Sequence, residues 1–216
     1  MNEFSVGSCI RFGWDTFKKR PWFFIGITVL LGIIWGLSSQ INSSIDSLQS
    51  PTGLIDIVMF IIGVAISVLL KMGSIKYFLK AHDNPEAAEI EDLWAPHPFW
   101  EFFIAGLVVG GIVLVGLILL IIPGIMWSLR FMFVPYLIMD RKLEMSEAFS
   151  ESGRITKGHK WQLFALLLAL GGINVLGILC LLVGLLVSIP VTYLATIHAY
   201  RTLEHKANEV AAPASA

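Results

Sequence analysis

Long apolar stretches separated by short polar segments dominate the pattern of this chain. The stretch 102–122 contains no polar side chain at all. As a helix rising ~1.5 Å per residue it would cross the ~30 Å hydrocarbon core of a bilayer. Similar stretches recur along the chain, and the two shorter ones carry Pro135 and Pro190. The pattern predicts an all-α, polytopic membrane bundle with six transmembrane helices at about 21–39, 53–72, 100–122, 124–140, 161–183 and 184–202.

The apolar stretches also repeat one another in sequence. A shift of 61 positions lays residues 100–120 over residues 161–181 and matches aromatic residues and glycines alike. The matched pairs include Trp100 with Trp161, Phe103 with Phe164, Gly110 with Gly171, Gly111 with Gly172 and Gly116 with Gly177. A fainter third copy begins at Trp22. We therefore expect three repeated helical hairpins, each preceded by a short interfacial helix on the cytoplasmic side.

Composition agrees with a membrane protein. Hydrophobic residues make up 56 % of the 216 residues, charged residues make up 14 %, and the mean hydropathy is +0.77. A water-soluble domain of this length cannot bury so much apolar surface. We expect residues 1–204 to form a single integral membrane domain and residues 205–216 to form a flexible tail. Cys9 and Cys180 lie far apart in the chain, so we expect neither a disulfide nor a metal pair.

Charge predicts the orientation, because Lys and Arg collect on the cytoplasmic side of a membrane. Basic residues precede the first predicted span and follow the second, fourth and sixth, whereas the expected outer turns at 123–124 and 183–184 carry none. This distribution predicts a multi-pass protein of the bacterial cytoplasmic (inner) membrane with both termini in the cytoplasm. Trp22, Trp100 and Trp161 open the odd-numbered spans and are expected to anchor them at the inner interface.

Amphipathic segments precede each predicted hairpin. Ile10, Trp14 and Phe17 share one face of the first, which we expect to lie along the lipid headgroups. The second is predicted to be a helix capped by Asn84 with an acidic outer face, and the third begins near Ser146. The simpler interpretation is that the acidic segment packs on the basic ones to orient the hairpins. The alternative is a cytoplasmic docking surface or a collar on anionic lipid.

Arg130 falls inside the predicted span 124–140, where a charge costs ~2.5–3.5 kcal/mol. One interpretation is an ion pair with Asp56 on the second span. The other makes Arg130 the anion-contacting group of an intramembrane polar site for a lipid or solute, with Asn174 as a further polar residue. The paired glycines Gly32 and Gly36, like Gly106 and Gly110, are predicted to mark close helix packing.

Motifs for chemistry are absent from the sequence. There is no Walker loop, no His-Glu-x-x-His pair, no Gly-x-Ser-x-Gly elbow and no Cys-x-x-Cys. The chain is therefore predicted not to be an enzyme, and no catalytic residue, cofactor or metal is expected. Basic residues are dispersed around the membrane boundaries, which excludes a nucleic-acid surface.

The stretch 121–203 carries a family resemblance. The residues concerned lie in 122–125, 133–138, 147–150 and 156–158, and Asp140 belongs with them. This stretch resembles a bacterial family of uncharacterised six-span integral membrane proteins related to the membrane domain of glycerophosphodiester phosphodiesterases. The resemblance implies a multi-pass membrane part able to serve a partner, and it implies no catalytic residues here.

These features favour a non-enzymatic membrane scaffold, or a membrane-homeostasis or interaction protein. Its expected partners are membrane lipid and a cytoplasmic or membrane protein. A small-solute or lipid transporter with Arg130 at its site is the alternative. A third interpretation is a membrane-embedded lipid-modifying enzyme that uses Glu101, Asp140 and Asp56.

Overall fold

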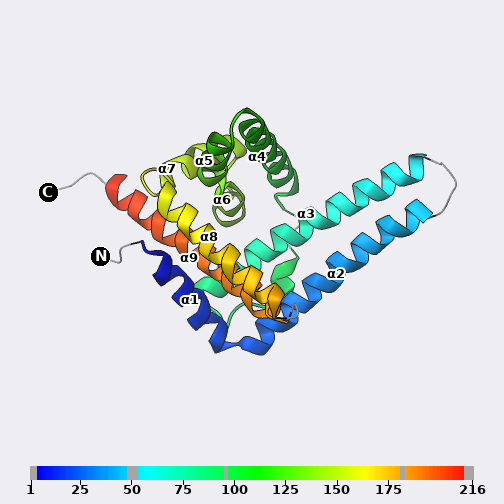
Figure 1. Cartoon of the computed structure of the whole chain (residues 1–216), viewed down its shortest axis with the longest axis horizontal. Coiled ribbons are helices and arrows are strands. Elements are labelled where there is room, and N and C mark those ends of the chain that lie inside the picture. The colour runs from blue at the N-terminus through cyan, green and yellow to red at the C-terminus, as the bar shows by residue number, and fades with distance from the viewer. Residues whose placement is uncertain (1–3, 48–52, 95–96, 181–182, 212–216) are drawn as a thin grey trace.

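The protein is built from helices throughout the part that the structure describes. The computed structural model describes residues 4–47, 53–94, 97–180 and 183–211. Nine α-helices and one 3₁₀-helix are formed within these ranges (Figure 1). They are α1 (Val6–Lys19), α2 (Pro21–Ser47), α3 (Gly53–Asp83), η1 (Ile90–Leu93), α4 (Phe99–Leu119), α5 (Ile121–Phe131), α6 (Val134–Arg141), α7 (Met145–Ile155), α8 (Lys160–Leu179) and α9 (Leu185–Ala211).

Helices α2 and α3 form a long hairpin that projects away from the other helices (Figure 1). Its inner half contributes large buried side chains to the core, among them Phe24, Tyr77 and Phe78. Farther out, Ile33 and Ile61 are more than half exposed. These two exposed apolar side chains are suited to contact with lipid.

Four helical stretches are long and apolar enough to cross a membrane in the described part of the chain. They are Ile61–Asp83, Phe99–Leu119, Ile122–Arg141 and Lys160–Leu179, and Pro21–Ile34 is a shorter apolar stretch. Trp22, Trp100 and Trp161 are 83 %, 70 % and 82 % exposed, which agrees with their expected role as interfacial anchors. The prediction of an all-helical protein with membrane-like helices is confirmed.

Glycines close the corners of two hairpins, α4–α5 and α8–α9. A Cβ placed on Gly116 would lie 2.8 Å from the Cα of Gly124. A Cβ placed on Gly184 would lie 2.6 Å from the Cα of Gly177. Since real side-chain atoms do not approach a backbone this closely, both corners require glycine. Gly116 and Gly177 are equivalent positions of the sequence repeat.

The other paired glycines behave differently from the prediction of close helix packing. A Cβ on Gly32, Gly36, Gly106 or Gly110 would meet nothing within 4 Å. The prediction is therefore wrong for contacts within this chain. On α4, Gly106 and Gly110 line a cavity together with Phe131 and Met132, so open space lies where a helix would have to pack.

The predicted span 124–140 is broken into two helices. Helix α5 ends at Phe131 and α6 starts at Val134, with Pro135 in its first turn. Proline is tolerated there because the first turn of a helix needs no intrahelical N–H donor. The expected outer turn at 123–124 is also displaced: Leu120 is extended and forms the corner, while 123–124 belong to α5.

Helix α9 occupies the centre of the fold and contacts α1, α2, α3, α7 and α8. It continues to Ala211, so residues 205–211, which we expected to begin a flexible tail, are helical. Helix α1 lies along α9, and a Cβ on Gly13 would come within 2.7 Å of the carbonyl oxygen of Val191. Phe17 is buried, whereas Trp14 is half exposed. Helix α1 therefore packs against α9, and its expected position along the lipid headgroups stays a prediction.

The acidic segment between α3 and α4 is mostly turn. Asn84 accepts a hydrogen bond from the Glu86 N–H at 3.1 Å, which closes a local turn. Asp92 accepts one from the Glu89 N–H and another from Lys80 on α3. These bonds hold the segment against α3, and only η1 is helical. The predicted amphipathic helix is therefore wrong here. The third segment does form a helix, α7.

Candidate functional site

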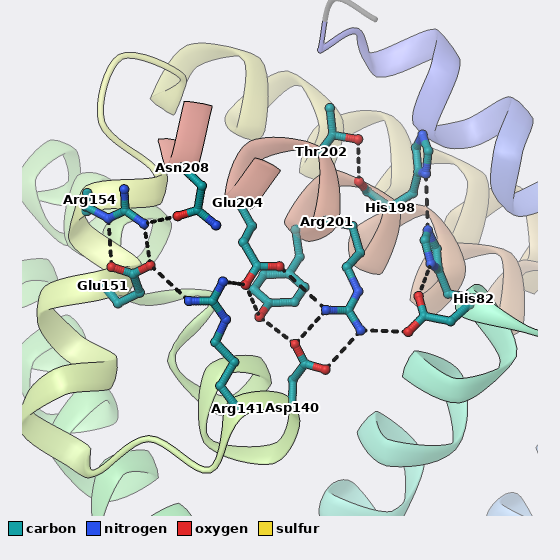
Figure 2. A network of polar contacts seen from close by, with 12 residues as sticks. His82, Asp140, Arg141, Glu151, Arg154, His198, Arg201, Thr202, Glu204 and Asn208 are labelled. Carbon is teal, nitrogen blue, oxygen red and sulfur yellow. Dashed lines mark hydrogen bonds and ion pairs between the residues drawn. The ribbon is translucent and has the colours of Figure 1, made fainter. Parts of the chain in front are cut away.

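Arg201 on α9 organises a network of polar contacts at one end of the bundle (Figure 2). Its guanidinium donates to both carboxylate oxygens of Asp140 on α6, at 2.6 and 2.9 Å. It also donates to Asp83 at the end of α3, at 2.7 Å. Forked pairing of this kind is the strongest arrangement available to arginine and carboxylate. One side chain thus connects three helices that are far apart in sequence.

A second arginine extends the network from α6 to α7 and α9. Arg141 lies 2.6 Å from Glu204 and 3.5 Å from Glu151 on α7. Glu151 in turn accepts two hydrogen bonds from Arg154, which also donates to the carbonyl oxygen of Ala207. Figure 2 shows these side chains in one continuous row. The network therefore ties the C-terminal ends of α3, α6 and α7 to the C-terminal half of α9.

The carboxylates of the network are paired with arginines. Hydrogen bonds from Arg154 lower the pKa of Glu151, and the charges of Arg154 and Arg141 act in the same direction, while burial raises it in part. Glu204 is buried and lies beside Arg141. The hydroxyl of Tyr200 lies 2.9 Å from Asp140 and 3.2 Å from Glu204. Groups paired in this way are poor proton donors or acceptors for chemistry, and the arrangement acts as a clamp.

Two histidines continue the clamp toward α1. Nε2 of His82 lies 3.2 Å from Nδ1 of His198, and Nδ1 of His82 lies 2.9 Å from Asp83. The ring of Phe12 stacks on His198 with centroids 4.1 Å apart. This chain of contacts links α1 to the end of α3 and the middle of α9.

Beyond the clamp lies a cavity of about 540 Å³ bounded by α3, α6, α8 and α9. Tyr136 connects the two regions, because its ring lines the cavity and stacks on Tyr200. Asn174 donates to Thr192 at 3.2 Å across the α8–α9 contact. Lys71 places a cation at the same cavity. The polar lining consists of Lys71, Tyr136, Asn174, Thr192, Tyr193 and Thr196.

A smaller cavity of about 320 Å³ lies on the other side of the α5–α6 break. Lys71, Met132 and Pro135 line both cavities. Apart from Lys71, the side chains of the smaller cavity are apolar, and its wall includes Gly106 and Gly110 of α4. A charged group therefore stands where a polar cavity meets an apolar one.

Of the three residues predicted for an intramembrane polar site, Arg130 and Asn174 are not brought together. Asn174 lines the larger cavity, as described. Arg130 is exposed on α5 beside Gly153 of α7, and its carbonyl oxygen accepts from Ser152 at 2.7 Å. Because α7 packs against α5, Arg130 meets this helix and lines neither cavity. The side chain of Asp56 lies outside the described residues, so the pair with Arg130 stays a prediction.

Sequence reasoning missed the clamp and Lys71. A signal for the clamp exists, since Tyr200, Arg201 and Glu204 share one side of α9. Lys71 carried a plainer signal, because it lies within the predicted span 53–72 as a second intramembrane cation. Among the described residues, no group of three or more His, Cys, Asp and Glu side chains is arranged to hold a metal ion.

Comparison with known proteins gives one match. Residues 105–207 match the model of a family described as "Protein of unknown function (DUF975)". The matched stretch runs from α4 into α9, and so includes Asn174 and most of the clamp. Lys71 and Asp83 lie outside it. No curated protein and no solved structure matches the chain.

Proposed function

We propose that the protein crosses the bacterial cytoplasmic membrane six times, as three repeated hairpins with both termini in the cytoplasm. Four apolar stretches of spanning length, exposed interfacial tryptophans and the distribution of Lys and Arg support this arrangement. The glycine corners at Gly116 and Gly177 support a common origin of two hairpins. In this orientation the clamp lies on the cytoplasmic side.

Within this membrane domain we propose a non-enzymatic role as a scaffold or interaction protein. The observation that carries the proposal is the clamp, which fixes α3, α6, α7 and α9 relative to one another and commits its carboxylates to arginines. A fixed cytoplasmic surface suits the binding of a partner better than it suits a catalytic cycle. Ile90 and Trp94 on the acidic segment are 58 % and 69 % exposed beside this surface and offer apolar contacts.

Photocrosslinking in the native membrane tests the scaffold role. A benzophenone amino acid at Trp94 is expected to capture one protein at near-stoichiometric yield. The matched control places the same amino acid at Ile118, which is 75 % exposed on α4 and expected to face lipid. Capture of lipid alone from both positions would contradict the scaffold role.

Handling of a lipid or small solute is the second candidate function. The observation that favours it is the polar cavity, where Asn174 and Thr192 face Lys71 inside the helical bundle. The transporter expected from the sequence had Arg130 at its site, whereas in this candidate Lys71 is the cation at the site. Loss of flux in an Asn174→Val variant that still inserts would support it, and unchanged flux would exclude it.

A further inference from the structure

Lys71 differs from the other lysines of α3 in having no counter-charge. Lys76 and Lys80 lie 3.8 and 2.7 Å from Asp92 on η1. Lys71 is exposed and, within the described ranges of the chain, makes no ion pair or hydrogen bond. It stands in the apolar stretch Ile61–Asp83, where an unpaired cation is costly. An external anion would remove that cost.

The depth of Lys71 is set by its neighbours. Gly73, two residues further along α3, packs against Leu93 so closely that a Cβ there would overlap the Leu93 carbonyl group. Leu93 belongs to the polar segment that joins the second and third predicted spans. Lys71 therefore lies just below the cytoplasmic headgroup region in the proposed orientation. Anionic lipids are abundant in that leaflet of a membrane.

Hydrogen-bond donors suited to a phosphate group converge on the same place. The ammonium of Lys71 offers three donors, and Tyr136, Tyr193 and Asn174 line the cavity with it. The first turn of α6 contributes Pro135 to the wall and carries the positive end of that helix. Phosphate oxygens are strong acceptors and pair well with such a set.

An apolar groove begins where the donors end. Phe102, Val109 and Phe131 line the smaller cavity beside Lys71. Gly106 and Gly110 keep it open on α4, since a Cβ at either position would meet nothing within 4 Å. A ligand with a phosphate group and an alkyl chain would match both cavities, whereas a free phosphate ion would use only the polar one.

We propose that Lys71 and the two cavities it joins bind one anionic phospholipid, with the phosphate at Lys71 and an acyl chain along Gly106 and Gly110. This site rests on the proposed membrane insertion and is independent of the scaffold role. Its ligand is a lipid of the cytoplasmic leaflet such as a phosphatidylglycerol.

Native mass spectrometry of the purified full-length protein with added dioleoylphosphatidylglycerol tests the site. The protein is expected to retain one lipid, and Lys71→Gln to lower its affinity by about tenfold, the loss of one charge-assisted contact. Gly110→Leu, which fills the groove, is expected to lower it as well, while Lys71→Arg retains it. Lys76→Gln and Gly171→Leu are the matched controls: one removes a paired lysine of α3, and the other alters the repeat-equivalent glycine on α8, which is equally open.

Three results would overturn the proposal. Equal lipid retention by Lys71→Gln and Lys76→Gln would show that the charge of Lys71 does not bind the lipid. Equal retention by Gly110→Leu and Gly171→Leu would show that the acyl chain does not lie in the groove. Displacement of the lipid by inorganic phosphate alone would assign the site to a free phosphate ion. Each variant is first tested for resistance to alkaline extraction from membranes, because failure there contradicts membrane insertion rather than the lipid site.

Discussion

The clamp depends on a hydrogen-bond geometry that only an arginine side chain supplies. Arg201 reaches Asp140 through two donors and Asp83 through another, while it is itself less than one-third exposed. A lysine at this position would offer a single ammonium and could not keep both oxygens of Asp140 bonded. The clamp therefore depends on the planar, forked guanidinium group of Arg201, and only in part on its positive charge.

Arg201→Met is expected to lower the free energy of unfolding in detergent by about 2 kcal/mol or more, since it leaves Asp140 without its partner in a half-buried site. Arg201→Lys should restore only part of the loss. Arg11→Gln is the control, because the Arg11–Asp15 pair is largely exposed and its loss should not be measurable. Equal effects of Arg201→Met and Arg11→Gln in thermal denaturation would contradict a structural clamp.

Glu151 gives the clamp a pH dependence of known sign. Its pKa is lowered in the folded protein by hydrogen bonds from Arg154. A lowered pKa contributes stability that is full above the ordinary carboxyl value of about 4.3 and is lost as the pH falls through the folded value. The melting temperature should therefore decrease below that pH, and Glu151→Gln should flatten the decrease. An acid limb as steep in Glu151→Gln as in the original protein would rule Glu151 out as a contributor.

Sequence could predict residues whose role depends on position along one helix, and it failed for residues whose role depends on a distant partner. Trp100 and Trp161, exposed at the starts of α4 and α8 as predicted, belong to the first kind. Asp140 and Arg201 belong to the second, because each is an ordinary charge near a helix end until the fold brings them within 2.6 Å. Arg130 lies beside Gly153 of α7, a neighbour that its position along the chain does not predict.

Elements are placed by tertiary contacts where local signals are weak. Asn84 and Pro85 are good signals for a helix start, yet Asp92 bonds to Lys80 and holds the segment as a turn. The sequence pattern of α1 predicts an apolar face that includes Trp14. In the structure the backbone of α9 instead approaches the side of α1 that carries Gly13. The long apolar helices were predicted well, because length and composition alone decide them.

The contact between α1 and α9 can be measured through Cys9. Cys9 is fully buried, and burial raises the pKa of its thiol to about 11, only partly offset by a hydrogen bond with Ser8. In a Cys180→Ser background it should react with a maleimide very slowly. Gly13→Val should raise the labelling rate at least tenfold, by pushing α1 off the backbone of Val191.

Gly7→Val is the control for this experiment. Only the Ser5 hydroxyl, at 3.8 Å, lies near the position of a Cβ on Gly7, so a larger side chain there should leave α1 in place. Rapid labelling of Cys9 in the unaltered chain, or equal labelling in Gly7→Val and Gly13→Val, would contradict the packing of α1 on α9.

At the scale of the whole molecule, the protein combines an apolar exterior with a polar clamp at one end. The outward faces of α4 and α8 are apolar over most of their length, whereas ionic contacts are concentrated where α3, α6, α7 and α9 end. This division is typical of a membrane protein whose helix ends reach water. Helix α9 runs through both regions. Its N-terminal half is apolar, and its C-terminal half carries the charged residues.

Cysteine-scanning topology in intact cells tests the three-hairpin arrangement most directly. Single cysteines are introduced at Ser47, Leu120, Val183, Glu86 and Lys157 of a chain lacking Cys9 and Cys180, and are exposed to a membrane-impermeant maleimide. The account predicts labelling at 47, 120 and 183 in intact cells, and labelling at 86 and 157 only after permeabilisation. Labelling of residues 120 and 157 from the same side would contradict it, because the clamp and the hairpin corners would then share one face of the membrane.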